Sequence, residues 1–226
     1  MSAGASSRPT FAERHLDPGD RLAEILFGLI MVLTVTLGAG MAVKDDPGAA
    51  RDLLLAALGC NIAWGLIDGG FYIMASLLER GRRARLVSAV TGAPDEAAAL
   101  RVIGRVLDDR LEGVADGDDR ARVYRLVRDL AAKAGPIPVR ITREDLMGAL
   151  ASCWLVVVAT IPAAIPFALM DEAYQALRVS NAVLLVLLFF AGASWGRHAG
   201  VHRWKSGAAF LAIGLVMVAV AIALGG

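Results

Sequence analysis

The sequence predicts an all-α, polytopic membrane protein with five transmembrane helices and a small helical cytoplasmic insert between the second and third. Two observations indicate this fold class. The 226 residues are 57% hydrophobic with a mean hydropathy of +0.58, which is too apolar for an ordinary soluble domain. The apolar residues also form continuous runs, each long enough to cross a bilayer of ~30 Å as a helix. These runs are 22–43, 53–78, 146–170, 179–196 and 206–226.

The runs divide the chain into four parts. We expect a mobile tail over 1–20, two membrane helices within 21–78, the insert over 79–145 and three membrane helices within 146–226. The first run follows a polar segment and is longer than the apolar core of a typical signal peptide, so we interpret it as a retained anchor. Residues 17–20 (DPGD) predict its start, and residues 44–50 predict a tight turn after it.

Positive charge is distributed unevenly over the segments that flank the runs. Most of the 23 Lys and Arg residues precede the first run, lie in 79–145 or separate the last two runs. Because such residues favour the cytoplasmic side, we expect the N-terminus and the insert inside, the C-terminus outside and the chain in the cell's inner (plasma) membrane. The arginines that follow the second run also form a basic collar for anionic lipid headgroups, and no nucleic-acid partner is indicated.

The insert is expected to be helical and too short for a large core of its own. Breaks are predicted at 94–96 (PDE) and 116–118 (DGD), an extended linker at 135–138 (GPIP) and a helix start at 142–145 (TRED). The acidic residues between 108 and 119 lack the spacing of an EF-hand, so a solvated helix end is favoured over weak cation binding. Two apolar stripes are predicted: Leu100, Ile103, Val106 or Leu107, and Leu111; and Val123, Leu126, Val127 and Leu130.

Asp68 is the only charged residue in the run 53–78. An ionised carboxylate near the middle of a bilayer costs ~2.5–3.5 kcal/mol, so such a residue normally faces a partner, a cavity or a transported ion. Asn61, Gly65 and Tyr72 share its helical face, which predicts a polar stripe through the membrane. Two interpretations stay open: an ion or proton pathway, and a hydrogen-bonded aspartate that holds helices together.

The first membrane helix offers a second candidate face, on which Glu24, Gly28 and Met31 follow one another. Glu24 is expected near the cytoplasmic interface, as the mouth of a pathway or as an ordinary interfacial charge. Counted from the ends of the runs, Met31 matches the depth of Asp68. A thioether beside a carboxylate suits a soft-to-borderline divalent metal, although methionine in a membrane helix is commonly a packing residue. The candidate metal-binding residues are Asp68, Met31, Glu24, Asn61 and Tyr72.

Two further patterns concern the last three membrane helices. Pro162 and Pro166 predict that the third helix is broken or kinked, and the fourth is expected to open at 180–181 (SN). His198 and His202 are four residues apart with no third ligand evident. We interpret them as interfacial polar residues, with a metal site as the alternative.

The order of these patterns resembles the vacuolar iron transporter family, of which the chain would be a divergent member. The resemblance covers about residues 21–226 and rests on four motifs: EILFGLIMVLTVT, GCNIAWGLIDGG, ATIPAAIPFAL and LLFFAGASWGR. It implies a homodimer that exports iron(II) or manganese(II) from the cytosol, with proton antiport as the coupling. The transported metal is then a substrate, and no resident cofactor is expected.

The chain also departs from that family. Met31 stands where the family has an aspartate, and Tyr72 lies near the position of an expected methionine. The insert has no methionine between Met74 and Met147 and few glutamates, so the family's metal-gathering domain is largely absent. The alternative function is therefore a non-transporting membrane scaffold or regulatory protein that keeps the fold. No nucleophile elbow, phosphate loop or HExxH motif occurs, so we do not expect an enzyme.

Overall fold

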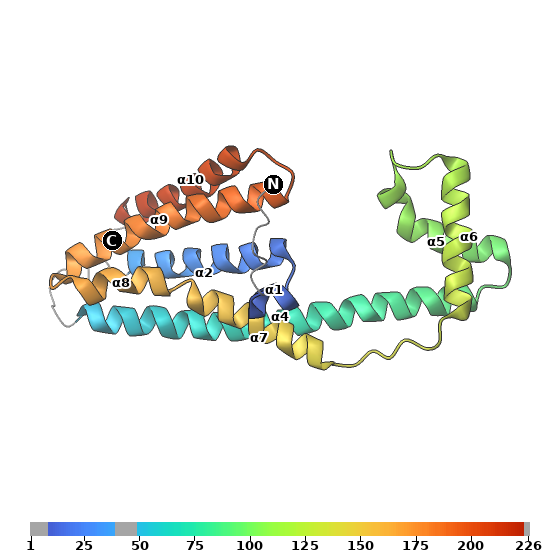
Figure 1. The fold of residues 1–226 in the computed structure, drawn as a ribbon, viewed down its shortest axis with the longest axis horizontal. Coiled ribbons are helices and arrows are strands. Elements are labelled where there is room, and N and C mark those ends of the chain that lie inside the picture. The colour runs from blue at the N-terminus through green and yellow to red at the C-terminus, as the bar shows by residue number, and fades with distance from the viewer. Residues whose placement is uncertain (1–8, 39–48, 224–226) are drawn as a thin grey trace, which may run out of the picture. The chain divides into compact units, whose positions relative to one another are not determined.

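The computed structural model describes residues 9–38 and 49–223, and every regular element in these ranges is an α-helix (Figure 1). Within them, five helical segments are long and apolar enough to cross a membrane, which confirms the predicted fold class. The helices are α1 (Phe11–His15), α2 (Pro18–Gly38), α4 (Ala49–Thr91), α5 (Glu96–Leu111), α6 (Gly117–Lys133), α7 (Arg143–Val158), α8 (Ile161–Leu169), α9 (Ala173–His198) and α10 (Arg203–Ala223).

The chain forms two compact units. The membrane unit comprises Met1–Tyr72 and Arg143–Gly226, and the insert unit comprises Ile73–Thr142. Helix α4 belongs to both, because it continues past residue 78, where the apolar run ends, to Thr91. Residues 79–85 are mostly charged and continue the helix, and Glu79 and Arg83 pair one turn apart at 3.1 Å. The hydropathy pattern marks the end of the apolar run and not the end of this helix.

The core of the membrane unit lies mainly between α2 and α9. Leu33, Leu184 and Leu188 have no exposed surface and pack with further aliphatic side chains of α2 and α8. Helix α10 packs closely on α9 because small residues line the contact: a Cβ atom on Gly207 would lie 2.8 Å from the Phe189 carbonyl oxygen. Such close approach is the usual basis of helix association in a bilayer.

The predicted break in the third membrane segment is confirmed. Helix α7 ends at Val158 and α8 begins at Ile161, with Pro162 in the first turn of α8 and Pro166 inside it. Each proline removes one backbone donor, so a continuous helix through this point would lose two hydrogen bonds. Ser180 of α9 donates to the carbonyl oxygen of Ala163 at 2.9 Å and so ties α8 to its neighbour.

Two predicted boundaries are wrong. The segment 1–20 was expected to be a tail, yet α1 forms within it: Thr10 and Glu13 make a capping box, and Ala12 is buried against α7. The fourth membrane helix was expected to open at 180–181, but α9 begins at Ala173, because Gln175 and Arg178 interrupt the apolar pattern of its first two turns. The turn predicted at 44–50 lies largely outside the described residues.

The insert unit contains the predicted helices, whose starts are set by Asp95 and Asp116 as side-chain caps. Ile103 is fully buried in its small core, and Leu107 packs there while Val106 is exposed. The second predicted stripe is partly wrong. Helix α6 packs through Val127, but Leu126 and Leu130 are about 60% exposed.

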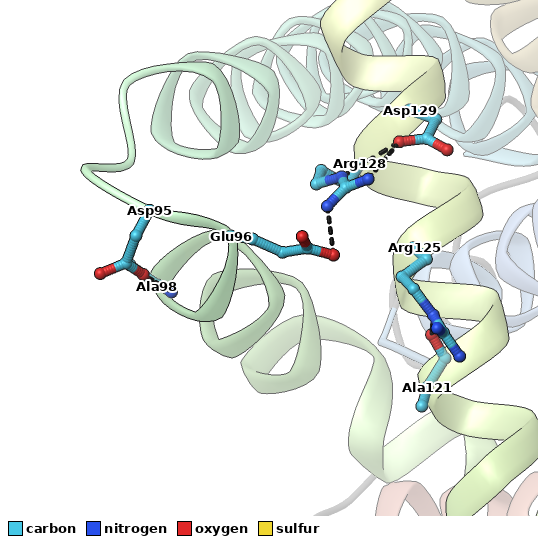
Figure 2. Close-up of polar contacts among 7 residues, drawn as sticks. All are labelled: Asp95, Glu96, Ala98, Ala121, Arg125, Arg128 and Asp129. Carbon is cyan, nitrogen blue, oxygen red and sulfur yellow. Dashed lines mark hydrogen bonds and ion pairs between the residues drawn. The ribbon is translucent and has the colours of Figure 1, made fainter.

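Polar contacts join α5 and α6 at the surface of the insert unit (Figure 2). Arg128 of α6 forms ion pairs with Glu96 of α5 and with its neighbour Asp129. Tyr124 donates a hydrogen bond to Asp108, which raises the pKa of the tyrosine. Within the acidic segment 108–119, Asp108 thus accepts a surface hydrogen bond and Asp116 caps a helix, in agreement with a solvated helix end.

Candidate functional site

A polar seam runs along the contact of α2, α4 and α7 in the membrane unit. Its best-defined member is Asn61 of α4, which has no exposed surface. The Nδ2 group of Asn61 donates to the carbonyl oxygens of Gly28 in α2, at 3.3 Å, and Val156 in α7, at 3.1 Å. One side chain therefore bridges all three helices. Its Oδ1 atom is buried and has no hydrogen-bond partner in the described part of the chain.

Glycines permit the close approach that forms the seam. A Cβ atom on Gly28 would lie 2.9 Å from the Val156 carbonyl oxygen. One on Gly65 would lie 3.0 Å from the Cys153 carbonyl oxygen, and one on Gly69 would lie 2.9 Å from that of Ala149. Because real Cβ atoms essentially never come nearer than ~3.0 Å to such atoms, these positions hold α7 against both other helices and fix their register.

Two carboxylates enter the seam from different helices, ~4.5 Å apart in depth. Glu24 of α2 accepts a hydrogen bond from Ser152 Oγ of α7 at 2.6 Å. Asp68 of α4 lies between Gly65 and Gly69, which both pack on the part of α7 that contains Ser152. The charge of Asp68 interacts with that of Glu24. Asp68 is half-buried, and its Oδ2 atom is buried without a hydrogen-bond partner among the described residues. The seam therefore brings together Glu24, Asp68 and Ser152 from three helices.

The register corrects the predicted depth of Met31. Helices α2 and α4 run in opposite directions (Figure 1). Gly28 of α2 lies beside Asn61 of α4, whose side chain donates to its carbonyl oxygen. Met31 lies three residues beyond Gly28 on one helix, and Asp68 lies seven residues from Asn61 in the other direction. At 1.5 Å per residue, the two side chains differ in depth by ~15 Å. Glu24, expected at the mouth of a pathway, lies four residues from Gly28 on the side toward Asp68, so the two carboxylates differ in depth by only ~4.5 Å. The depth count failed because the ends of the two apolar runs are not level: Gly28 lies six residues from the start of its run, whereas Asn61 beside it lies 17 residues from the end of its own.

Tyr72 closes the seam beyond Asp68. Its ring packs on Gly148 of α7, where a Cβ atom could not be accommodated, and its hydroxyl donates to the carbonyl oxygen of His15 at 3.3 Å. His15 ends α1, and its Nδ1 atom lies 3.3 Å from an oxygen of Glu144. The short helix α1 therefore packs against the end of the seam that Tyr72 occupies.

The structure brings part of the predicted residue set together on one seam, and whether that set binds a metal stays a prediction. Asn61, Gly65 and Tyr72 all face α7, so these residues share one face of α4 as predicted, and that face is a helix contact. Ser152 was missed; it is a hydroxyl among the small residues of GALASCW, a pattern that signals close packing more clearly than chemistry.

The oxygen atoms of Glu24, Asp68 and Ser152 are suited to a proton or a hard-to-borderline divalent cation. Among the described residues, no three His, Cys, Asp or Glu side chains group as a metal site. His198 ends α9, with its Nδ1 atom 2.9 Å from the Ser194 carbonyl oxygen, whereas His202 lies in the following loop. The metal alternative requires the two histidines to share a helix face, and they do not.

Comparisons with known proteins add no relative: the chain matches no protein-family model and no curated protein sequence.

Proposed function

We propose that this protein moves a small cation across the bilayer and that Glu24 and Asp68 form the charge-bearing site. The observation that carries the proposal is the position of two carboxylates from different membrane helices on one seam, ~4.5 Å apart in depth and close enough for their charges to interact. A carboxylate in a bilayer is costly, and two neighbouring carboxylates also repel each other. A cation or a proton held between them offsets both effects, so the pair favours a site that is loaded and emptied.

The alternative role for Asp68, holding helices together, has less support from the contacts. Asn61 already bridges the three helices through two hydrogen bonds, whereas Asp68 Oδ2 has no such partner in the described chain. A residue whose only role is to join helices is expected to use its hydrogen-bonding atoms. Asp68 instead offers a buried oxygen that has no partner among the described residues, close enough to Glu24 for their charges to interact.

We assign the substrate class by resemblance. Similarity to the vacuolar iron transporter family favours export of iron(II) or manganese(II) from the cytosol by a homodimer, with protons as the counter-ion. Oxygen ligands from Glu24, Asp68 and Ser152 suit manganese(II) and iron(II). The competing class is a membrane scaffold or regulatory protein with no flux, and the test below separates the two.

The test is flux in proteoliposomes that contain the full chain. Manganese(II), iron(II), zinc(II) and proton movements are followed with the wild type and with Asp68→Asn, which keeps the side-chain volume and hydrogen-bonding capacity but removes the charge. The proposal expects wild-type flux of at least one of these cations and a loss of ~100-fold or more in the variant. Asp171→Asn, an exposed change outside the seam, is the matched control and keeps wild-type flux.

Two outcomes would contradict the proposal. Wild-type liposomes that move none of these cations would favour the scaffold class. Wild-type flux in a folded Asp68→Asn variant, combined with loss of folding in Asp68→Leu, would make this aspartate a structural residue.

A further inference from the structure

A second site lies away from the seam, where α2 and α10 end and α9 begins. A cavity of about 240 Å³ opens there between the three helices. Its lining includes Thr36 of α2, Tyr174, Arg178 and Asn181 of α9, and Ile222 of α10. Neither carboxylate of the seam contributes to it.

The polar groups of this cavity are ordered by depth along α9. Arg178 is exposed at the rim, and in the described part of the chain its guanidinium contacts only Tyr174: it donates to the hydroxyl at 3.2 Å and lies 5.4 Å from the ring centre. Asn181 lies three residues deeper, ~4.5 Å along the axis. Its Oδ1 atom is 2.6 Å from Thr36 Oγ1, while its Nδ2 group donates to no described residue. A cationic donor at the rim is thus followed by a neutral donor inside.

Below these donors the walls are hydrocarbon. Leu185 and Val218 line the deeper part of the cavity. A second groove of about 310 Å³ runs along the adjoining face of α9, lined by Val179, Ala182, Val183, Val186 and Leu187. Ala182 belongs to both linings, so a single small side chain separates the two apolar grooves.

We propose that this place binds one anionic glycerophospholipid, with its phosphate on Arg178, an ester carbonyl on Asn181 Nδ2 and its acyl chains in the two grooves. The order of charge, neutral donor and hydrocarbon matches the order of groups in such a lipid. Arginine presents a planar fork to phosphate, and an arginine near the end of a membrane helix places its guanidinium at headgroup level. The neutral or zwitterionic alternative would leave a cation at the rim without a net opposite charge.

Binding of lipid to the full chain in detergent micelles tests the proposal. Native mass spectrometry measures the affinity for phosphatidylglycerol and for phosphatidylcholine with the same acyl chains. We expect one tightly bound phosphatidylglycerol per chain, a loss of about tenfold or more in Arg178→Gln, and equal affinities for the two lipids in that variant. Ala182→Trp should weaken the binding of both lipids, because it fills the grooves.

Arg203→Gln is the matched control. Arg203 also lies over an aromatic ring, 4.2 Å from the centre of Trp204, but does not line the cavity, and its loss should change the affinity less than twofold. Size-exclusion chromatography and circular dichroism check the fold of each variant. If Arg178→Gln does not fold, the loss of lipid affinity in Ala182→Trp becomes the test of the proposal.

Four results would overturn the proposal. These are equal affinity of the wild type for the two lipids, wild-type affinity in Arg178→Gln, wild-type affinity in Ala182→Trp, and an equal loss in Arg203→Gln. Displacement of the lipid by millimolar glycerol phosphate would show that the site takes a soluble phosphate instead.

Discussion

Adjacent glycines in α4 offer a matched test of the seam. Gly69 faces α7, and a Cβ atom there would lie 2.9 Å from the Ala149 carbonyl oxygen, whereas one on Gly70 would meet nothing within 4 Å. Replacing either glycine by alanine in a helix gains ~1 kcal/mol of helix propensity. At Gly69 the new methyl group also forces two backbones apart, and overpacking of this kind typically costs ~1–3 kcal/mol.

The two variants should therefore separate in stability. Gly70→Ala is expected to raise the free energy of unfolding by up to ~1 kcal/mol, and Gly69→Ala to lower it by up to ~2 kcal/mol. Reversible unfolding of the full chain in mixed micelles, followed by circular dichroism, measures both. Because Gly69 follows Asp68, its variant should also reduce cation flux. Equal stability of the two variants would refute the register of α4 on α7.

Three further outcomes follow from the same contacts. Asn61→Ala removes two interhelical hydrogen bonds, each worth ~0.6 kcal/mol in a membrane, and should lower the unfolding free energy by ~1–2 kcal/mol in the same micelle assay; an unchanged value would contradict the bridge. Met31→Leu should leave cation flux within about twofold of the wild type, since Met31 lies ~15 Å in depth from Asp68; a large loss would restore Met31 as a ligand. Reporter fusions at Gly135 and Gly226 should report opposite sides of the membrane, as the arginine distribution predicts, and the same side for both would contradict five spans.

The fold class could be predicted because a bilayer imposes a long apolar run on each spanning helix, and these runs are visible in the sequence. Helix ends were predicted less well. Gln175 and Arg178 interrupt the apolar pattern at the start of α9, and α4 continues beyond its apolar run, so hydropathy located the membrane-spanning parts and missed the boundaries. The capping box of α1 is readable in the sequence as a Thr and a Glu three apart, but its five residues lie in a segment whose composition is typical of a tail.

In the candidate site too, one part could be predicted from the sequence and another could not. Periodicity within one helix correctly grouped Asn61, Gly65 and Tyr72 on one face, because spacing along a single helix determines which residues share a side. The pairing of Asp68 with Glu24 depends on the register between helices, which arises from glycine contacts with a third helix and is not encoded in either helix alone. Ser152 was missed for that reason: its role appears only when α7 is placed between α2 and α4.

The central claim is that Glu24 and Asp68 act as one cation site. A double-mutant cycle on flux, with Glu24→Gln, Asp68→Asn and the combined variant in proteoliposomes, tests it most directly. Residues that act as a unit give non-additive effects, so each single variant should lose about as much flux as the double variant. Multiplicative losses, with the double variant slower by the product of the two single effects, would show that the carboxylates act separately and would contradict the account.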